Sequence, residues 1–402
     1  MNVSLFIARR YFLARRKRSF ISLISIISML GVGVGTMALV IILSVFNGME
    51  ALNRQLFKSF DADLKAMPTT GKRFESSEAL LQKTQQTVGI KLVTSVIEDN
   101  ALARYGDRRT VVKLKGVDTN YLQRHQLDNA MLDGQLMLMD GDAPQALVGI
   151  TAQNALSLNV ADFLTPLELW YPRNNTATLR FDSPAAFNQQ IIRAAGVFGI
   201  EQHFDNYVIV PLPFAAQLLD YQNQRTALEI TLLPNIDPDQ VKADLQQKLG
   251  NTFKVQTRDE LNADLLRAIR IEKLFVTIAL GLIVLVAAVN IFFSLSMLVI
   301  EKRADLRMLF AMGATTTLVR NIFLFEGAIV AFVGAVLGLI LGTVICWLQQ
   351  QYGFVSMGTA TSLIEAYPVK MELMDFVVTA CLVVVITILV SVVPANRAAH
   401  KQ

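Results

Sequence analysis

Four long apolar runs divide the chain into stretches of opposite character. They cover residues 20–46, 274–300, 327–348 and 376–393, and none of them contains a charged side chain. A helix rises about 1.5 Å per residue, so about 20 apolar residues cross a hydrocarbon core that is ~30 Å thick. We therefore place four transmembrane helices, at residues 20–46, 274–300, 322–348 and 376–393.

A long stretch of mixed pattern, residues 47–273, separates the first two spans. Alternating or β-branched runs predict strands near residues 90–97, 108–117, 206–212 and 227–233. Helical periodicity marks residues 76–86, 212–221 and 238–249. In the last of these, Asp237 can cap the helix and Gly250 follows its end. The predicted fold class is a membrane α-helical protein with four transmembrane helices and a large α+β periplasmic domain inserted between helices 1 and 2.

Both ends of this inserted domain carry helical patterns. Residues 47–60 continue the first apolar run as an amphipathic helix, and residues 257–273 lead into the second run without Gly or Pro. We therefore expect the first two transmembrane helices to extend beyond the membrane as helical stalks that carry the domain.

The charges beside the apolar runs orient the chain. Residues 1–19 carry six basic side chains and no acidic one, which predicts a basic amphipathic helix on the cytoplasmic side. Four spans then place the segment 301–321 and the tail 394–402 in the cytoplasm, and the domain 47–273 and the loop 349–375 outside it. The first apolar run is about twice as long as the core of a signal peptide, so we interpret it as a retained anchor.

Composition argues against an enzyme. Only 17% of the residues are charged, against about 25% in a soluble domain, and the net charge is +4. The histidines at 125, 203 and 400 are isolated, and neither a Cys/His spacing for a metal nor a P-loop for ATP occurs. We therefore expect no catalytic residue, no metal site, no cofactor bound by this chain and no nucleic-acid partner.

Glycines recur at helical spacing inside two of the predicted spans. Gly31 and Gly35 lie four residues apart in the first, and Gly334, Gly338 and Gly342 repeat every four residues in the third. Small residues at this spacing let helices approach closely in a membrane. We predict that both sets mediate helix–helix packing.

The segment 301–321, EKRADLRMLFAMGATTTLVRN, is a charged interruption between two spans. One face of a helix collects Leu306, Leu309, Phe310 and Gly313. Gly313 suits the end of that helix, and Thr315 or Thr316 can cap the next one. The segment is thus a short amphipathic helix and a tight turn on the inner face of the membrane, either an ordinary interfacial helix or a docking surface.

The stretch LVIEKRADLRMLFAMGATTTLVRNIFLFEGAIVAFVGAVLGLILG resembles the permease domain of FtsX/MacB-type ABC transporters. In that family the segment that corresponds to residues 301–314 is the coupling helix, which seats on the ATPase. The resemblance implies these ATPase-coupling residues: Glu301, Lys302, Arg303, Asp305, Leu306, Leu309, Phe310, Met312, Gly313 and Ala314.

Both ends of the chain are similar to lipoprotein-releasing permeases of the LolC/LolE type. The start, FIARRYFLARRKRSFISLISIISMLGVGVGTMALVIILSVFNGMEALNRQLF, and the end, VVPANRAAHKQ, carry this similarity. It implies a subunit of the bacterial inner membrane that pairs with a second permease, identical or related, and binds two copies of a cytoplasmic ATPase. That ATPase, which uses ATP and Mg²⁺, would drive the extraction of lipoproteins and their transfer to a periplasmic carrier.

The resemblance also implies functional positions outside the coupling helix. In the family, spans one and two form a cavity for the lipoprotein, and the matching residues include Met37, Val40, Ile41, Val45, Leu280, Val284, Ala288 and Phe292. One type of family member carries a hairpin that recruits the carrier. The region 171–187 has turn residues that suit such a hairpin, or a plain surface loop, and its possible carrier contacts are Tyr171, Pro172, Arg173 and Arg180.

Two other functions of the same superfamily stay open. An FtsX-like scaffold would activate a cell-wall hydrolase and move no substrate, but FtsX-type external domains are much smaller than residues 47–273. A MacB-like exporter would carry its ATPase in the same chain, whereas no ATPase motif occurs in these 402 residues. We therefore expect lipoprotein release, with the scaffold and the exporter as alternatives.

Overall fold

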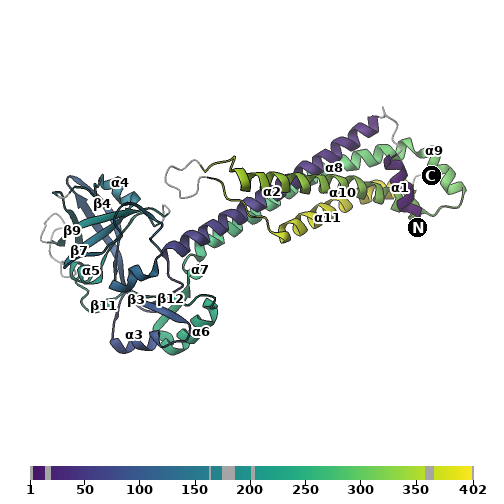
Figure 1. Ribbon diagram of the computed structural model, residues 1–402. Helices are drawn as coiled ribbons and strands as arrows, with labels where there is room; N and C mark the ends of the chain where they lie inside the picture. Colours follow the sequence, from purple (N-terminus) through teal and green to yellow (C-terminus); the bar gives the residue numbers. More distant parts are fainter. Residues whose placement is uncertain are drawn as a thin grey trace. The chain divides into compact units, whose positions relative to one another are not determined.

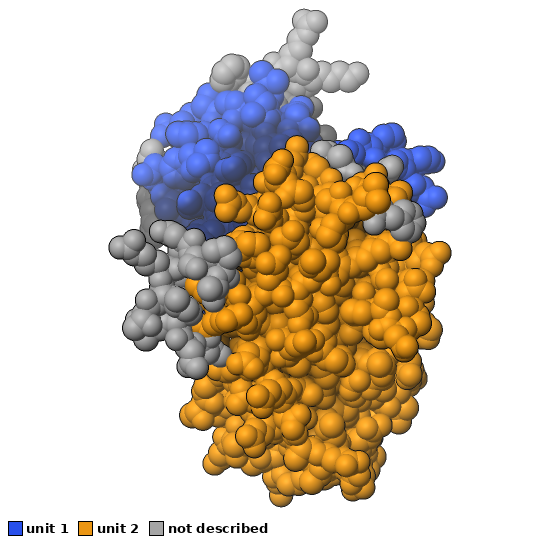
Figure 2. Space-filling model, turned by 90° about the vertical axis from the view of Figure 1, so that its left-hand side faces the viewer, with its two compact units in different colours: residues 1–52, 265–357, 365–402 blue, residues 53–264, 358–364 orange. Residues whose placement is uncertain are grey.

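The computed structural model describes residues 3–13, 20–162, 164–173, 186–200, 204–357 and 366–400. The chain forms two compact units, which Figure 2 colours separately. The first unit comprises residues 1–52, 265–357 and 365–402, and the second comprises residues 53–264 and 358–364.

Four long helices build the first unit (Figure 1). They are α2 (Phe20–Phe60), α8 (Ala263–Glu301), α10 (Thr316–Tyr352) and α11 (Leu373–His400). Each contains a stretch that is long and apolar enough to cross a membrane, and in the described part of the chain there are four such helices. The prediction of four membrane-spanning helices is therefore confirmed.

Apolar side chains and glycines hold these helices together. The core between them contains Val32, Leu39, Ile291, Leu295, Val330 and Val383. A Cβ atom added to Gly35 would lie 2.7 Å from Cγ2 of Val284, and one added to Gly334 would lie 2.5 Å from the carbonyl oxygen of Met29. At Gly338 the added atom would lie 2.3 Å from the carbonyl oxygen of Gly33. A side chain at these three positions would push the helices apart. The contacts at Gly31 and Gly342 are looser, 3.3 Å from Ala287 Cβ and 3.2 Å from Val40 Cβ.

Two short helices, α1 (Val3–Leu13) and α9 (Arg303–Ala311), lie at one end of this bundle (Figure 1). In α1, Ser4 and Ala8 are buried, whereas Leu5 and Phe6 are exposed. In α9, Leu306 is buried and Met308 is exposed. Each short helix therefore has one face against the bundle and another face open.

The second unit contains one large sheet and a two-stranded one. The strands of the large sheet are β1 (Leu64–Pro68), β3 (Ile90–Tyr105), β4 (Arg108–Val117), β5 (Met131–Gly134), β6 (Met139–Asp140), β7 (Ala143–Gly149), β8 (Leu167–Pro172), β9 (Phe187–Phe198), β10 (Tyr207–Pro211), β12 (Ala227–Leu232) and β13 (Phe253–Thr257). The small sheet pairs β2 (Phe74–Glu75) with β11 (Gln224–Arg225). The helices are α3 (Glu78–Gln85), α4 (Ile150–Leu156), α5 (Leu212–Leu219), α6 (Pro238–Leu249) and α7 (Arg258–Leu261), with 3₁₀ turns η1 (Thr119–Arg124) and η3 (Gly250–Thr252).

Part of the large sheet closes into a ring. Its pairings run β3–β4–β10–β7–β9–β8 and return from β8 to β3, with β4–β10 and β7–β9 parallel. The ring encloses one core, which includes Leu114, Val148 and Val208. A second core, which includes Leu64, Leu228 and Leu245, lies between the open part β13–β1–β12 and helix α6. Strand β3 belongs to both parts, because β12 pairs with its first half and β8 with its second.

The predicted local elements agree with the structure, with one exception. Strand β4 has the predicted bounds, and Asp237 caps α6 by accepting a hydrogen bond from the backbone N–H of Asp239. Helices α2 and α8 both extend beyond the apolar runs, but the helical pattern over 257–273 is interrupted once. Thr257 caps the short helix α7 in a capping box with Glu260, and the non-helical Asn262 separates α7 from α8.

The outer end of α2 is anchored by aromatic rings within the second unit. Phe57 and Phe60 are almost fully buried. The ring centroid of Phe60 lies 4.6 Å from that of Phe204 and 4.8 Å from that of Tyr207. Each buried ring stabilises the contact by about 1.5–3 kcal/mol. The last turns of α2 are therefore part of the core of the domain that α2 carries.

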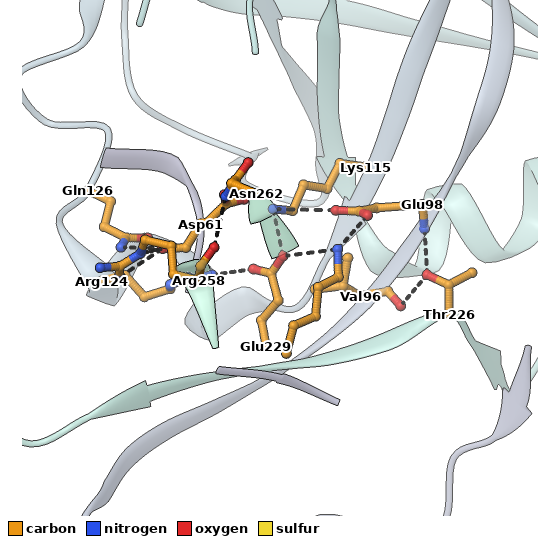
Figure 3. A network of polar contacts seen from close by, with 11 residues as sticks. Asp61, Val96, Glu98, Lys115, Arg124, Gln126, Thr226, Glu229, Arg258 and Asn262 are labelled. Atoms are coloured by element: carbon orange, nitrogen blue, oxygen red, sulfur yellow. Dashed lines mark hydrogen bonds and ion pairs between the residues drawn. The ribbon is translucent and has the colours of Figure 1, made fainter. Parts of the chain in front are cut away.

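An ion cluster lies beside Phe60, because Lys115 Nζ lies 4.4 Å from the centroid of that ring. Figure 3 shows the cluster, in which Lys115 and Glu229 are buried and Lys65 and Glu98 are half-buried. It consists of Lys65, Glu98, Lys115, Arg124 and Glu229. Lys115 Nζ lies 2.8 Å from Glu229 Oε1, and Lys65 Nζ lies 2.7 Å from Glu98 Oε2. Arg124 forms an ion pair with Glu229 as well. The strand register creates these contacts, because Lys65 lies opposite Glu229 and Glu98 lies opposite Lys115.

The cluster holds its charges ionised inside the protein. Burial alone would raise the pKa of Glu229, but Lys115 and Arg124 outweigh it and hold that pKa well below its usual range. Burial alone would lower the pKa of Lys115, but Glu229 outweighs it and raises that pKa. Each charge is therefore tolerated only while its partners stay in place.

Polar contacts near the cluster join the two helix ends that enter the domain. Asn262 donates a hydrogen bond to Asp61 Oδ2 at 2.8 Å, and Arg258 forms an ion pair with Asp63 at 2.8 Å. Asp61 directly follows α2, and Asn262 directly precedes α8. The ends of both long helices are thus fixed to each other inside the second unit.

We predict that Glu229→Gln destabilises the inserted domain by about 3–5 kcal/mol at pH 7, because it leaves Lys115 and Arg124 buried without their anion. Hydrogen exchange of the full chain in detergent measures this loss. Asp259→Asn is the matched control, since Asp259 forms an ion pair with Arg54 and both side chains are about half exposed. The free energy of unfolding of this control should fall by less than about 1 kcal/mol.

The pH dependence of the free energy of unfolding tests whether the charge of Glu229 causes this loss. Because the folded pKa of Glu229 is lowered, its stabilisation is present above the unfolded pKa of about 4.3 and is lost as the pH falls toward the folded value. The difference between the wild type and the Gln variant should therefore shrink below about pH 4. A difference that is constant with pH would contradict the ionic role of Glu229.

Candidate functional site

Helix α9 and the turn after it form the first part of the candidate site. Gly313 has φ +88°, and the backbone N–H of Ala314 donates to the carbonyl of Leu309 at 3.0 Å. These contacts end the helix in the manner that glycine permits. Thr315 then caps α10 by accepting from the N–H of Leu318 at 3.2 Å. The predicted tight turn between the two helices is present.

The apolar stripe of α9 faces the protein's own core. Leu306 is buried, and Leu309 and Phe310 are half-buried against a cluster of α8, α10 and α11. The residues of that cluster include Leu298, Val299, Val319, Phe323, Ala395 and Ala398. Three of the expected coupling residues therefore fix α9 to the bundle, and two of them, Leu309 and Phe310, keep part of their side chains exposed.

The opposite face of α9 is open. Met308 is 58% exposed and Met312 is 75% exposed, and Arg303, Arg307 and Gly313 are exposed beside them. Glu301 is exposed too, whereas Lys302 and Asp305 form an ion pair at 3.3 Å. Ala314 is half-buried in the turn. The exposed face of α9 thus carries two methionines, Met308 and Met312, beside two arginines, Arg303 and Arg307.

The expected cavity residues divide into two groups. Val40, Val284 and Ala288 are buried in contacts between helices of this chain. The other five are half-buried: Met37, Ile41, Val45, Leu280 and Phe292. In this arrangement the buried three cannot line an open cavity, and only the half-buried five present surface outside the bundle.

A polar cluster joins three membrane helices at the end opposite α9. Lys273 of α8 donates to Asn47 Oδ1 at 2.7 Å and contacts Asp375 Oδ1 at 3.2 Å. Asn47 of α2 also donates to Asp375, which lies in the first turn of α11. We call Asn47, Lys273 and Asp375 the outer triad. It closes a ring of contacts in which every member touches the other two.

The segment before α11 contacts α2 next to the outer triad. The N–H of Lys370 donates to the carbonyl of Ser44 at 2.9 Å, and Gln350 donates to the carbonyl of Val369 at 3.3 Å. A Cβ atom added to Gly48 would lie 2.5 Å from the carbonyl carbon of Pro368. The segment 366–372 therefore lies directly on α2 beside the outer triad.

Sequence reasoning did not identify the outer triad, although a signal for it exists. Asn47, Lys273 and Asp375 each lie directly beside the end of an apolar run, at 46, 274 and 376. Polar residues at that position usually contact water or lipid headgroups. That these three contact one another follows only from the packing of α2, α8 and α11.

Two of the four expected carrier contacts, Tyr171 and Arg173, have partners inside the second unit. The Tyr171 hydroxyl donates to Asp99 Oδ2 at 3.0 Å, and Arg173 donates to Asn188 at 2.9 Å. Burial and the bond to Asp99 raise the pKa of Tyr171. Pro172 ends strand β8 and is exposed. Arg180 lies outside the described residues.

Among the residues that the structure describes, no three His, Cys, Asp or Glu side chains gather into a group that could hold a metal ion. The Asp and Glu side chains of the ion cluster and the outer triad contact lysine, arginine or asparagine instead.

We predict that Lys273→Met lowers the free energy of unfolding of the full chain by about 1.5–3 kcal/mol, because Asp375 and Asn47 lose a charged partner. Thermal unfolding in detergent measures the loss. Lys370→Met is the matched control, since Lys370 pairs with Glu372 at the surface. Equal losses in the two variants would contradict a structural role for the outer triad.

Comparison with known families matches both units. The family model described as FtsX-like permease C-terminal matches residues 277–402. The model described as MacB-like periplasmic core domain matches residues 25–248, which is more than half of the chain. The first match contains α9 with the second, third and fourth membrane helices, and the second contains most of the inserted domain.

Individual relatives extend over the whole chain. The lipoprotein-releasing system transmembrane protein LolE of Haemophilus influenzae is 23% identical, with 100% of this chain and 98% of that protein covered. The lipoprotein-releasing system transmembrane protein LolC of Xylella fastidiosa is 24% identical, with 100% of this chain and 97% of that protein covered. The crystal structure of the periplasmic region of MacB from Actinobacillus actinomycetemcomitans gives a TM-score of 0.37 at 11% identity, with 52% of this chain and 94% of that chain covered.

The two family matches occur in the same order along the chain as the observed domain and membrane helices. The MacB-like periplasmic domain lies between the first and second of four long apolar helices, and the permease match begins in the second helix. The chain therefore belongs to the FtsX/MacB-like family of ABC-transporter permeases, the membrane subunits that work with an ATPase.

Proposed function

We propose that this chain is the permease subunit of an ABC transporter that extracts lipoproteins from the bacterial inner membrane and passes them to a periplasmic carrier. The observation that carries the proposal is the end-to-end similarity to LolE and LolC, which covers 100% of this chain in both alignments. Similarity confined to the membrane helices would support only a permease of unknown cargo.

The proposed arrangement has the chain ends in the cytoplasm. The basic side chains of α1 and the exposed Arg303 and Arg307 of α9 lie at one end of the bundle, as expected for the cytoplasmic side. The outer triad and the inserted domain then belong to the periplasmic side. A second permease, identical or related, would complete the transporter with two ATPase copies, which would bind ATP and Mg²⁺.

The proposed mechanism is mechanical. The partner ATPase would press on the open face of α9 when it binds and hydrolyses ATP. Because Leu306, Leu309 and Phe310 pack against α8, α10 and α11, movement of α9 would be passed to these helices. Helices α2 and α8 run without interruption from the membrane part to the inserted domain, so they suit the transfer of that movement.

The lipoprotein would bind beside α2 and α8 on the half-buried apolar side chains. Each methylene group of an acyl chain that leaves water gains about 0.8 kcal/mol. Met37, Ile41 and Val45 recur every four residues along α2 and so form a strip of this kind. Straightening or tilting of α2 would narrow the space beside the strip and expel the acyl chains.

We expect a photo-crosslinking side chain at Ile41 or Val45 to form adducts with acylated lipoprotein in native membranes, and ATP to abolish them. Leu389 is the matched control, because it is apolar and 65% exposed but lies on α11. It should give phospholipid adducts alone. No lipoprotein adduct at Ile41 or Val45, or equal adducts at Leu389, would contradict lipoprotein release and favour a signalling scaffold.

The open face of α9 gives a second test. Met308→Asp should lower copurification of the partner ATPase by about tenfold or more, because a carboxylate would be buried in an apolar contact. The melting temperature of the permease should stay unchanged, since Met308 is exposed. Leu309→Asp should lower the melting temperature as well. Normal copurification of the ATPase with the Met308→Asp variant would show that the ATPase does not dock on the open face of α9.

A further inference from the structure

An apolar groove lies between α1 and α9. Its volume is about 600 Å³. Its apolar walls include Phe6, Ile7 and Tyr11 of α1 and Met308, Leu309 and Met312 of α9. Its charged lining residues are Arg10 and Asp305. Such a volume admits one or two large side chains.

The groove is built rigidly rather than by two loose helices. Helix α1 is fixed to the bundle through Ser4, which is 5% exposed, and Ala8, which is fully buried. The ammonium group of Lys302 lies 5.2 Å from the ring centroid of Tyr11 and pairs with Asp305 at 3.3 Å. Both walls are therefore held in place before any partner binds.

The groove is continuous with the open face of α9. Met308 and Met312 belong to both, so a partner that covers this face of α9 also reaches the groove. Methionine side chains adapt their shape and are frequent at protein-binding surfaces. Phe6 is 48% exposed on the other wall.

The charge around the groove indicates the chemistry of the occupant. Arg9 and Arg10 of α1 and Arg303 and Arg307 of α9 are all exposed, and Asp305 is paired with Lys302. A partner that inserts an apolar side chain here would meet a basic rim. An acidic rim around that side chain would complement it.

We propose that α1 is the second wall of the ATPase docking surface, so that an apolar side chain of the ATPase, flanked by acidic residues, inserts between α1 and α9. This inference rests on the proposed function, which supplies the ATPase. It gives the ATPase a direct contact with α1, in addition to its contact with α9.

The test compares two neighbouring residues of α1. Phe6→Asp places a carboxylate in the groove, whereas Leu5→Asp places one on the same helix outside it, at nearly the same exposure, 46% against 48%. Binding of the purified ATPase to the full-length permease in nanodiscs is measured for both. Phe6→Asp should weaken binding roughly 30-fold, as for a central contact residue, and Leu5→Asp by about twofold or less.

Three outcomes would overturn the proposal. Unchanged binding in both variants would show that α1 is not part of the docking surface. Equal loss in both would show that α1 acts only as a membrane anchor. A photo-crosslinker at position 6 that captures phospholipid and no ATPase would assign the groove to lipid, whereas an ATPase adduct there supports the proposal even if Phe6→Asp folds poorly.

Met308→Asp separates this inference from the proposed function. Loss of ATPase binding in Met308→Asp with normal binding in Phe6→Asp would reject α1 and leave docking through α9 intact. Normal binding in both variants would reject docking through α9 as well.

Discussion

The charge of Glu229 has to be neutralised inside the protein, and the inserted domain is arranged around that requirement. Its partners come from three separate elements: Lys65 from β1, Lys115 from β4 and Arg124 from η1. Lys115 also lies 4.4 Å from the ring centroid of Phe60, at the end of α2. The sheet, the 3₁₀ turn and the end of the first long helix therefore assemble together, because a missing partner would leave a charge buried alone.

Charged and polar side chains also pair with one another at one end of the long helices. The outer triad places Lys273 between Asn47 and Asp375, and so joins α2, α8 and α11 at one end of the bundle. At the other end, apolar packing of Leu306 and its neighbours joins α9 to the bundle. A polar contact at one end and an apolar contact at the other thus connect the long helices and α9 with one another.

Local sequence signals predicted much of this fold because they depend on near neighbours. The four apolar runs, the capped helix after Asp237 and the turn at Gly313 and Thr315 are all encoded within a few residues. The break at Asn262 was missed because its cause is partly distant: the Asn262 side chain bonds to Asp61, which lies 201 positions earlier in the chain. The order of the strands was also unreadable, since the closing pair β3–β8 joins residues far apart in the sequence.

The sequence by itself determined that this protein has four membrane helices, an α+β domain between the first two and a short amphipathic helix between the second and third. Hydrophobic periodicity is sufficient for those conclusions, because it shows which face of a helix avoids water. It does not show what covers that face. Only the tertiary structure decided that Leu306, Leu309 and Phe310 pack against other helices of the chain and that Met308 and Met312 stay exposed. The reason is that packing consumes some apolar surfaces and leaves others, and the contacts that decide this come from helices whose positions no local pattern specifies.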